Sequence, residues 1–328
     1  MIERIHLEGY KSIKKMDLKL QPINIFIGAN GSGKSNLISY FKLVHNLYEQ
    51  RLCNYTMQNN AEDLVYFGLK HTQEISSEIV CKEGSYSFTL QPRANGSMFI
   101  ATEDSMSSQM TAHLASFRYY HFHDTSKASP LRGKSDIEDN HTLSSDGSNL
   151  ASMLYYIKEK HPKAFKRIEL VIKSVMPYFD RFNLQPSQLN TERIELRWID
   201  VNSPDKYFSA RHLSDGSIRF IALATLLLQP SLPELIKIDE PELGLHPQAI
   251  NKLAGLIRSA AERGCQTIIA TQSADFISNF DASCIITVDK PQGQSYFNRL
   301  QPDQLQTWLE EYTLGELWSK SIIKGQPF

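Results

Sequence analysis

The fold can be predicted from residues 22–36, Pro22-Ile-Asn-Ile-Phe-Ile-Gly-Ala-Asn-Gly-Ser-Gly-Lys-Ser-Asn36. Four of its residues have the spacing G-x-x-x-x-G-K-[ST], which is typical of a phosphate-binding loop: Gly28, Gly33, Lys34 and Ser35. Glycines let the backbone adopt positive φ and bring its N–H groups close to phosphate oxygens. The lysine can reach a β- or γ-phosphate, and the serine hydroxyl can bind Mg²⁺. The stretch therefore predicts a phosphate site that also holds magnesium.

The residues on either side of the loop predict a strand that enters it and a helix that leaves it. Ile23, Ile25 and Ile27 are apolar at every second position, as in a strand. After the loop, apolar residues recur at the spacing of one helix face, to about residue 50: Leu37, Ile38, Phe41, Val44 and Leu47. The order suits a phosphate site, because such a helix directs its N-terminal dipole at the anion.

The composition is that of a globular protein with a real core. The 328 residues suggest one large domain or two lobes that share a sheet, and 41% are hydrophobic and 22% charged. The net charge of −1 gives no general attraction to nucleic acid or anionic lipid. No run of ~18 apolar residues is present, and the N-terminus lacks a signal-peptide core. The sequence thus excludes a transporter subunit that carries its own membrane helices.

The cysteines predict a reducing compartment. The four of them have no C-x-x-C spacing, which argues against a zinc module and a disulfide framework: Cys53, Cys81, Cys265 and Cys284. We therefore expect a cytoplasmic protein with no membrane contact.

The first half of the chain is predicted to be rich in strands. Residues 2–20 alternate around a turn at 9–12, which predicts a hairpin at a sheet edge. Four short β-rich runs then predict an antiparallel subdomain: 63–70, 74–81, 85–91 and 97–102. A helix is predicted over 103–116. The aromatic run 117–124 is expected to form a strand that re-enters the central sheet.

The second half begins with a predicted long loop over 125–148. Helical spacing over 149–179 predicts two helices separated at Pro162. Further strands are predicted at 193–201 and 206–210. Helix and strand then alternate over 213–288, as in a parallel sheet, and the chain is expected to end with a strand and two helices: 295–300 and 302–321.

Three polar segments in this second half supply the parts that phosphoryl transfer needs. The apolar run 235–238 ends in Asp239 and Glu240, which at a strand end beside the loop would lie near the metal and the attacking water. Leu213-Ser-Asp-Gly-Ser217 precedes an apolar helix, which Ser214 or Asp215 can cap. Residues 267–273 form a strand ending in Gln272, where a polar side chain can sense a γ-phosphate.

This order of motifs resembles the head of ABC-type ATPases of the RecF and SMC branch, and most of all the compact "AAA family ATPase" proteins of bacterial defence loci. The resemblance covers residues 1–50 and 205–320. It rests on the phosphate loop, on the 213–217 segment, on Ile238-Asp-Glu-Pro-Glu-Leu-Gly-Leu-His-Pro247, on Ala270-Thr-Gln-Ser273 and on Leu314-Gly-Glu-Leu-Trp318. It implies an α/β P-loop fold with a central mixed sheet, an antiparallel β subdomain and a helical insertion.

The resemblance also implies roles for individual residues. Two protomers would sandwich two ATP molecules with Mg²⁺, with residues 242–246 along the dimer seam. Ser35 and Asp239 would support the metal, Glu240 would activate water, and Gln272 would occupy the switch position. Ser214 and Gly216 would reach the γ-phosphate of the partner protomer. The ATP bound in the same chain would contact the loop: Asn30, Gly31, Ser32, Gly33, Lys34, Ser35 and Asn36.

Three departures from the family pattern predict slow turnover. Asp215 and Ser217 replace the common glycine and glutamine of the signature, and a carboxylate near phosphates costs Coulomb energy unless it is paired or points away. Gln272 replaces the usual histidine. The glutamine that completes the magnesium shell has no clear counterpart; we predict that Asp124 takes its place, with a structural role as the alternative.

Two functions fit these features. The first is a nucleotide-gated switch that controls a separate effector such as a nuclease or toxin in anti-phage defence, since no nuclease constellation is visible in the chain. Trp308 and Trp318 are candidate docking residues, although burial in the core is the favoured interpretation of both. The second is a DNA-repair head that clamps DNA through a patch of basic residues. The alternative for these residues is an ordinary solvent-exposed helix face without a ligand. They are Lys158, Lys160, Lys163, Lys166, Arg167 and Lys173. The absence of heptads excludes long coiled-coil arms.

The whole chain, 1–328, is predicted to be one ATPase head in four parts. They are a P-loop lobe, a β and helical insertion, a lobe with the signature and the Asp-Glu strand, and a helical tail: 1–60, 61–205, 206–300 and 301–328.

Overall fold

The computed structural model describes residues 1–326, which form two compact units. The first contains residues 1–117, 233–239 and those from 264 onward, and the second contains 118–232 and 240–263. The chain crosses between the units four times as a result. One crossing separates Asp239 from Glu240, the two neighbouring carboxylates that the sequence predicts to act together.

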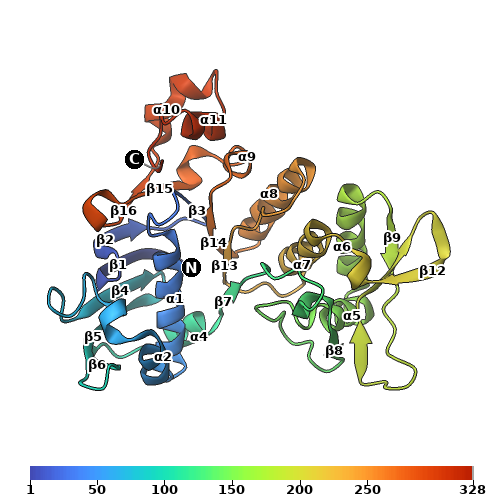
Figure 1. Ribbon diagram of the computed structural model, residues 1–328, viewed down its shortest axis with the longest axis horizontal. Helices are drawn as coiled ribbons and strands as arrows, with labels where there is room; N and C mark the ends of the chain where they lie inside the picture. The colour runs from blue at the N-terminus through green and yellow to red at the C-terminus, as the bar shows by residue number, and fades with distance from the viewer. Residues whose placement is uncertain (327–328) are drawn as a thin grey trace. The chain divides into compact units, whose positions relative to one another are not determined.

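The central sheet has six strands in the order β16-β15-β3-β14-β13-β7 (Figure 1). Their bounds are Ile23–Ile27 for β3, Phe117–Tyr120 for β7, Leu235–Asp239 for β13, Gln266–Thr271 for β14, Ile285–Asp289 for β15 and Tyr296–Arg299 for β16. The four strands from β15 to β13 run parallel, and β16 is antiparallel to β15. All five residues of β3 are buried, as expected for a strand of a parallel sheet that is covered on both faces. The predicted mixed sheet is confirmed, and the strand predicted over 117–124 forms over Phe117–Tyr120 alone.

A second sheet in the first unit is antiparallel, in the order β2-β1-β4-β5-β6. Its strands are β1 Ile2–Tyr10, β2 Ile13–Lys19, β4 Ile75–Cys81, β5 Gly84–Pro92 and β6 Met98–Glu103. The hairpin predicted over 2–20 is confirmed, with β2 at the sheet edge. Buried and partly exposed residues alternate along β4, which is typical of a strand with one covered face.

Helix α1, Lys34–Tyr48, packs against both sheets of this unit (Figure 1). It contacts β13 and β14 of the central sheet, and its Tyr40 hydroxyl lies 2.5 Å from the Ser77 hydroxyl of β4 in the antiparallel sheet. The sequence predicted a single apolar face. Tyr40 and Leu43 are also buried, because the second sheet covers a side of the helix that the pattern left open.

The strand predicted over 63–70 is wrong. Residues 63 and 64 end helix α3, Ala61–Leu64, and Val65 makes only an isolated bridge with Tyr10. Phe67 and Gly68 have φ of 54° and 79°, and a strand cannot continue through two residues with positive φ. The other helices before the central sheet are α2 Leu52–Asn59 and α4 Ser108–Ala115, the latter within the predicted 103–116.

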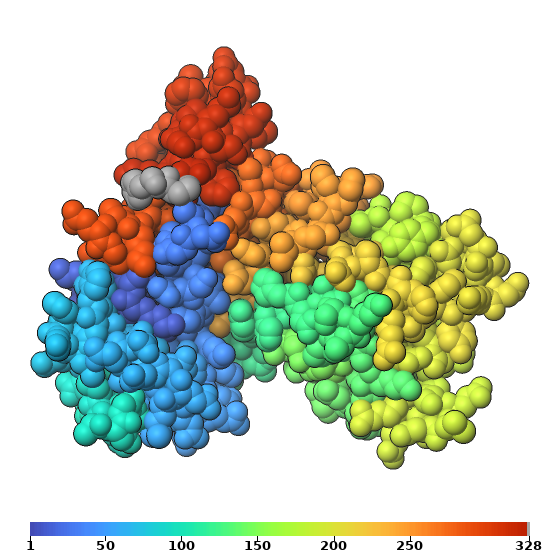
Figure 2. Space-filling view, in the orientation of Figure 1, coloured from blue at the N-terminus to red at the C-terminus, as the bar shows by residue number. Residues whose placement is uncertain are grey.

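The end of the described chain forms short helices: α9 Ala274–Ile277, α10 Pro302–Leu309 and α11 Leu314–Ser319. Figure 2 shows the C-terminal segment, in red, standing out from the rest of the first unit. Trp318 is buried, as expected. Trp308 is 46% exposed, so the prediction that it lies in the core is wrong. Leu305 is the only buried residue of α10, which leaves the tryptophan side of that short helix uncovered.

The second unit is built on four helices: α5 Leu150–Lys160, α6 Pro162–Val175, α7 Asp215–Leu228 and α8 Pro247–Glu262. Pro162 begins α6, where its missing N–H costs nothing, and the predicted break is confirmed. The strands are β8 Lys134–Asp136, β9 Phe179–Phe182, β10 Arg193–Glu195, β11 Arg197–Asp200 and β12 Ser203–Ser209. The loop predicted over 125–148 is interrupted, since β8 pairs with β10.

Across residues 1–326 no helix combines the length and the apolar character that crossing a bilayer requires.

Candidate nucleotide site

Three of the predicted segments meet at one edge of the central sheet in the first unit. Strands β3, β14 and β13 are neighbours and parallel, so their carboxyl ends lie at the same edge. The register pairs Asp239 with Ala270, and Ala270 with Phe26. Neighbouring strands lie ~4.8 Å apart, and β14 is the one strand between β13 and β3. The end of β13 at Asp239 therefore lies about two strand spacings from the end of β3, where the phosphate loop begins. Gln272 directly follows the last residue of β14, between these two strand ends.

The phosphate loop has a backbone that requires glycine. Gly31 and Gly33 have φ of 77° and 113°, and Gly33 is the N-cap of α1. A Cβ atom on Gly33 would lie 2.1 Å from the hydroxyl oxygen of Ser295, and one on Gly28 would lie 2.4 Å from the carbonyl oxygen of Val288. A side chain is therefore excluded at Gly33 by conformation and by space, at Gly31 by conformation and at Gly28 by space.

Lys34 and Ser35 begin α1 directly after the loop. Lys34 is 7% exposed, and its Nζ donates hydrogen bonds to the carbonyl oxygens of Gly28 at 2.5 Å and Ala29 at 3.0 Å. The ammonium thus lies over the loop that would carry the phosphates. Ser35 is exposed at the helix start, where the helix dipole favours anions.

A chain of hydroxyl groups braces the loop, and it is not among the features predicted from the sequence. Asn36 Nδ2 donates to Ser12 Oγ at 2.6 Å, Ser12 Oγ lies 2.7 Å from Ser295 Oγ, and Ser295 Oγ donates to the Ser32 carbonyl at 2.6 Å. Ser12 and Ser295 are 283 positions apart in the chain. No local pattern could have indicated that they meet at the loop.

A groove of about 420 Å³ lies beside the loop in the same unit. Ser12 and Asn36 of the brace are among its lining residues, and the others include Lys11, Asp63, Phe67 and Lys290. Burial lowers the pKa of Lys11, and the charge of Asp63 opposes that shift. The groove combines an aromatic ring with charged and polar groups, which suits a flat heterocycle and a sugar.

The residues of this edge fit a magnesium ion that is shared with phosphate. Among residues 1–326 no group of three or more His, Cys, Asp or Glu side chains could hold a metal alone. Magnesium in phosphate sites takes one or two protein oxygens and fills its octahedron with phosphate and water. Ser35 and Asp239 supply oxygens of that kind, and the glycine loop offers the phosphate cradle.

The predicted signature segment begins α7 in the second unit. Ser214 is exposed and is the N-cap, and its Oγ accepts a hydrogen bond from the Ser217 amide at 3.1 Å. A Cβ atom on Gly216 would lie 2.2 Å from the Gly244 carbonyl oxygen. Residues 242–246 therefore pack directly on the start of this helix, and that packing alone requires glycine at position 216.

Glu240 and Asp124 also belong to the second unit. Glu240 has a positive φ of 42°. Residues other than glycine adopt this conformation at a cost in free energy, and such residues are concentrated at functional sites. Asp124 is exposed, and its Oδ1 accepts a hydrogen bond from the Ser126 amide at 3.0 Å. The side chain of Ser126 and then its backbone amide lower the pKa of Asp124. These bonds fit the structural alternative for Asp124.

Arg219, in α7, joins two segments that flank predicted site residues, and no sequence pattern indicates this role. It is 5% exposed. Its guanidinium donates to the carbonyl oxygens of Phe122 at 2.8 Å and His123 at 3.0 Å, and to that of Leu243. Burial lowers its pKa, opposed first by the charge of Asp215. The segment before Asp124 and the turn after Glu240 are thereby held by one side chain.

Solved structures with a similar fold include heads of SMC proteins. One, described as the SMC head bound to the C-terminal winged-helix domain of ScpA, aligns with a TM-score of 0.65 at 18% identity, over 93% of this chain and 99% of that chain. Another, from Pyrococcus furiosus and also described as bound to a domain of ScpA, gives 0.61 at 16% identity over 94% and 98%. These likenesses show the P-loop ABC-type fold.

Curated relatives match shorter segments. The transporter ATP-binding protein EcfA2 of Mesomycoplasma hyopneumoniae is 30% identical over 32% of this chain and 34% of its own length. RecF of Acinetobacter baylyi is 31% identical over 24% of this chain and 22% of its own. The Old nuclease of Escherichia phage P2 is 48% identical over 17% of this chain and 10% of its own. The chain thus spans about a third of the length of the first of these relatives.

Two family models cover most of the chain. The model described as "AAA ATPase domain" matches residues 1–107, and the model described as "AAA domain, putative AbiEii toxin, Type IV TA system" matches residues 112–278, just over half of the chain. ATPases of this type use ATP with Mg²⁺ and generally hydrolyse it. The chain therefore belongs to the family described as "AAA domain, putative AbiEii toxin, Type IV TA system", among the ABC-like ATPases of the RecF and SMC branch.

Proposed function

We propose that this protein binds and slowly hydrolyses ATP as a homodimer and acts as a nucleotide-gated switch for a separate effector, such as a nuclease or toxin, in defence against phage. The observation that carries the ATPase part is the meeting of the phosphate loop, Asp239 and Gln272 at one edge of the central sheet. The family description, which names a toxin, and the short match to the phage P2 Old nuclease support the effector part.

In this proposal the protein positions ATP and a water molecule for hydrolysis to ADP and phosphate. Loop residues 30–36 and the start of α1 hold the phosphates, and Lys34 exchanges its bonds to loop carbonyls for phosphate oxygens. Ser35 and Asp239 hold Mg²⁺, which neutralises charge on the β- and γ-phosphates when bound. Glu240 accepts a proton from the attacking water, and Gln272 orients the γ-phosphate. The groove beside Asn36 receives the base and ribose.

The second half of each site comes from the partner protomer in this proposal. Ser214 is exposed at a helix N-terminus, where amide groups and the helix dipole suit an anion. ATP held by both protomers then stabilises the dimer by mass action. We place Asp124 in the magnesium shell as a further part of this proposal.

We retain the division into parts 1–60, 61–205, 206–300 and 301–328 as a proposal for how the head is assembled. The exposed Trp308 of the last part is the stronger docking candidate for an effector, because Trp318 is buried. A cytoplasmic location agrees with the four cysteines, all free.

The test uses Glu240→Gln, which removes the base and keeps the shape of the side chain. With ATP and Mg²⁺ this variant is expected to bind nucleotide, to lose turnover by about 10²-fold or more, and to accumulate as a dimer in multi-angle light scattering. Wild-type protein with ADP is the control and should remain monomeric. Turnover equal to wild type would reject Glu240 as the base, and only monomer with ATP would reject the sandwich.

The alternative function is a DNA-repair head that clamps DNA. The predicted basic residues do lie on α5 and α6, but three of them pair with acidic neighbours: Lys158 with Glu159, Lys166 with Glu169, and Lys173 with Asp180. Binding to duplex DNA with ATP at several salt concentrations separates the two functions. A steep loss of affinity with salt indicates phosphate contacts and favours the clamp, whereas no binding favours the switch.

A further inference from the structure

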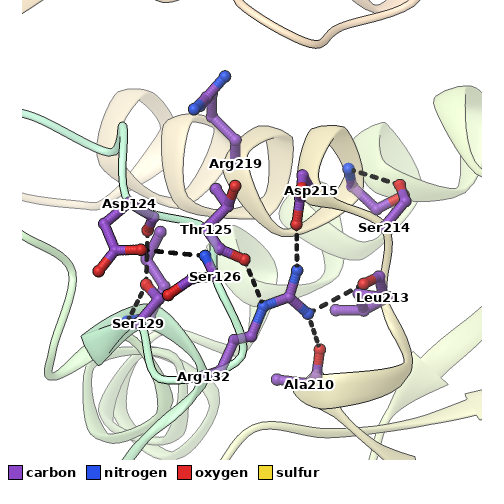
Figure 3. A network of polar contacts seen from close by, with 12 residues as sticks. Asp124, Thr125, Ser126, Ser129, Arg132, Ala210, Leu213, Ser214, Asp215 and Arg219 are labelled. Carbon is purple, nitrogen blue, oxygen red and sulfur yellow. Dashed lines mark hydrogen bonds and ion pairs between the residues drawn. The ribbon is translucent and has the colours of Figure 1, made fainter.

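A buried arginine lies beneath the turn that begins α7 (Figure 3). Arg132 is 8% exposed and donates hydrogen bonds in four directions. Its Nη1 reaches the carbonyl oxygens of Ala210 at 2.5 Å and Leu213 at 2.9 Å, its Nε that of Thr125 at 2.9 Å, and its Nη2 the Asp215 carboxylate at 2.8 Å. One rigid guanidinium thus holds the backbone before Ser214 and the side chain of the residue after it.

Asp215 forms an ion pair with Arg132 at the start of this helix. Its side chain is 70% exposed, while the Arg132 side chain is 4% exposed. A buried guanidinium is costly unless a carboxylate and hydrogen bonds satisfy it, and Asp215 is the acidic partner that the structure records for Arg132. The carboxylate that stands where the signature commonly has glycine is therefore engaged with an arginine of its own chain.

The side chain of Ser214 is held from the other side, by the first turn of α7. Its Oγ accepts from the Ser217 amide and donates to Ser217 Oγ at 2.8 Å, and Ser217 Oγ lies 2.8 Å from the Tyr178 hydroxyl. Arg132 fixes the peptide before Ser214, and these bonds fix the hydroxyl. The Ser214 turn is thereby held in one conformation before any partner arrives, which lowers the entropy that binding must supply.

We propose that Arg132 is a positioning residue for the nucleotide of the partner protomer, and that Asp215 serves as its counter-ion and not as a ligand of phosphate or metal. The inference rests on the proposed function, since it concerns how Ser214 is presented to that nucleotide. The bond from Arg132 to the Thr125 carbonyl extends the coupling to the residue after Asp124. The position of the signature turn and that of the candidate metal-shell segment are then set by one side chain.

The decisive variant is Asp215→Gly, which restores the common signature glycine at an exposed position. If Asp215 faces phosphate, removing its charge raises turnover. If it is the counter-ion of Arg132, the variant leaves a buried guanidinium without its carboxylate, and kcat falls by about tenfold. Binding of ATP to the monomer should change by less than about twofold, because the phosphate loop is untouched.

A set of companion variants separates positioning from general damage. Asp215→Asn keeps an acceptor for Nη2 and should retain more activity than Asp215→Gly. Arg132→Met should lose ATP-dependent dimer in the Glu240→Gln background, Arg132→Lys should recover only part of it, and the double variant Arg132→Met/Asp215→Gly should be no worse than Arg132→Met. Arg181→Met is the control, since that arginine is 53% exposed and pairs with its neighbour Asp180.

The outcomes distinguish the two proposals. If wild-type protein neither binds ATP nor dimerises, the proposed function fails and this inference falls with it. If wild type behaves as proposed and Asp215→Gly equals or exceeds its kcat, only the role of Arg132 and Asp215 is overturned. Strictly additive losses in the double variant would also overturn it. Circular dichroism checks that Arg132→Met folds, and the exposed Asp215 variants decide the matter if it does not.

Discussion

Single glycines of the phosphate loop show how closely the residue scale controls this site. Gly33 combines positive φ with a neighbour, Ser295 Oγ, that would lie 2.1 Å from an added Cβ. That hydroxyl is also part of the chain from Asn36 to the Ser32 carbonyl. A side chain at position 33 therefore strains the backbone and displaces the brace at the same time.

Gly33→Ala is expected to lower the free energy of unfolding by about 1–3 kcal/mol and to abolish ATP binding. The matched control is Gly255→Ala in α8, where an added Cβ meets nothing within 4 Å; it should raise the unfolding free energy by about 0.5–1 kcal/mol. Urea unfolding and binding of a fluorescent ATP analogue measure both. Normal ATP binding by Gly33→Ala would contradict the assignment of the loop.

At the scale of one element, β13 carries a lysine in a strand that is otherwise apolar before Asp239. Lys237 is 2% exposed, and its Nζ lies 5.2 Å from the centre of the Phe41 ring of α1. Burial, with a smaller contribution from the charge of Lys42, lowers the pKa of Lys237 to about 7. An unfolded lysine titrates near 10.4. Between about pH 7 and 10 the unfolded chain thus binds more protons than the folded one, and stability rises with pH.

Lys237→Met removes this titration at nearly constant volume. The variant should be more stable than wild type at pH 7, and its advantage should shrink by up to about 1.4 kcal/mol per pH unit towards pH 10. Urea midpoints at pH 7, 8 and 9 test this, with the exposed Lys252→Met as the control. A difference that does not change with pH would show that Lys237 has an ordinary pKa in the folded protein.

At the scale of the whole molecule, the question is whether one nucleotide uses residues of two chains. Lys34 lies in the first unit and Ser214 in the second. The proposal assigns Lys34 to the ATP of its own chain and Ser214 to the ATP of the partner. Variants that damage one or the other can therefore complement each other only if the site is shared.

Lys34→Ala and Ser214→Arg are each expected to lose at least about 10²-fold in turnover. In an equal mixture, half of the dimers would contain one chain of each variant. In such a mixed dimer, the intact loop of the Ser214→Arg chain meets the intact signature turn of the Lys34→Ala chain and forms one complete site. ATPase activity should then reappear in the mixture, at up to about a quarter of wild type by counting intact sites. The control is a mixture of Lys34→Ala with the double variant that carries both Lys34→Ala and Ser214→Arg. A mixture no more active than its components would reject the shared site, as would wild-type turnover by Ser214→Arg alone.

Elements whose cause is local could be predicted from the sequence alone. The strand, loop and helix around residues 22–48, the 2–20 hairpin and the break at Pro162 follow from hydrophobic period, from glycine conformations and from the missing proline N–H, which act within a few residues. The parallel arrangement of β3, β14 and β13 also followed, because alternating helices and strands have few ways to bury their apolar faces. The positions of Asp239 and Gln272 at the strand ends came with it.

Tertiary structure decided whatever depends on residues far apart in the chain. The positive φ of Phe67 and Gly68 ended a run that local propensity predicted as strand, and lack of cover left Trp308 exposed. Ser12 reaches Ser295 and Arg132 reaches Asp215 across 283 and 83 positions. Such pairs produce no periodic pattern in the sequence, because they are stabilised by desolvation and hydrogen bonding in the folded core. The chain passes from the first unit to the second between Asp239 and Glu240. This boundary is likewise a property of packing, which two adjacent residues in the sequence do not reveal.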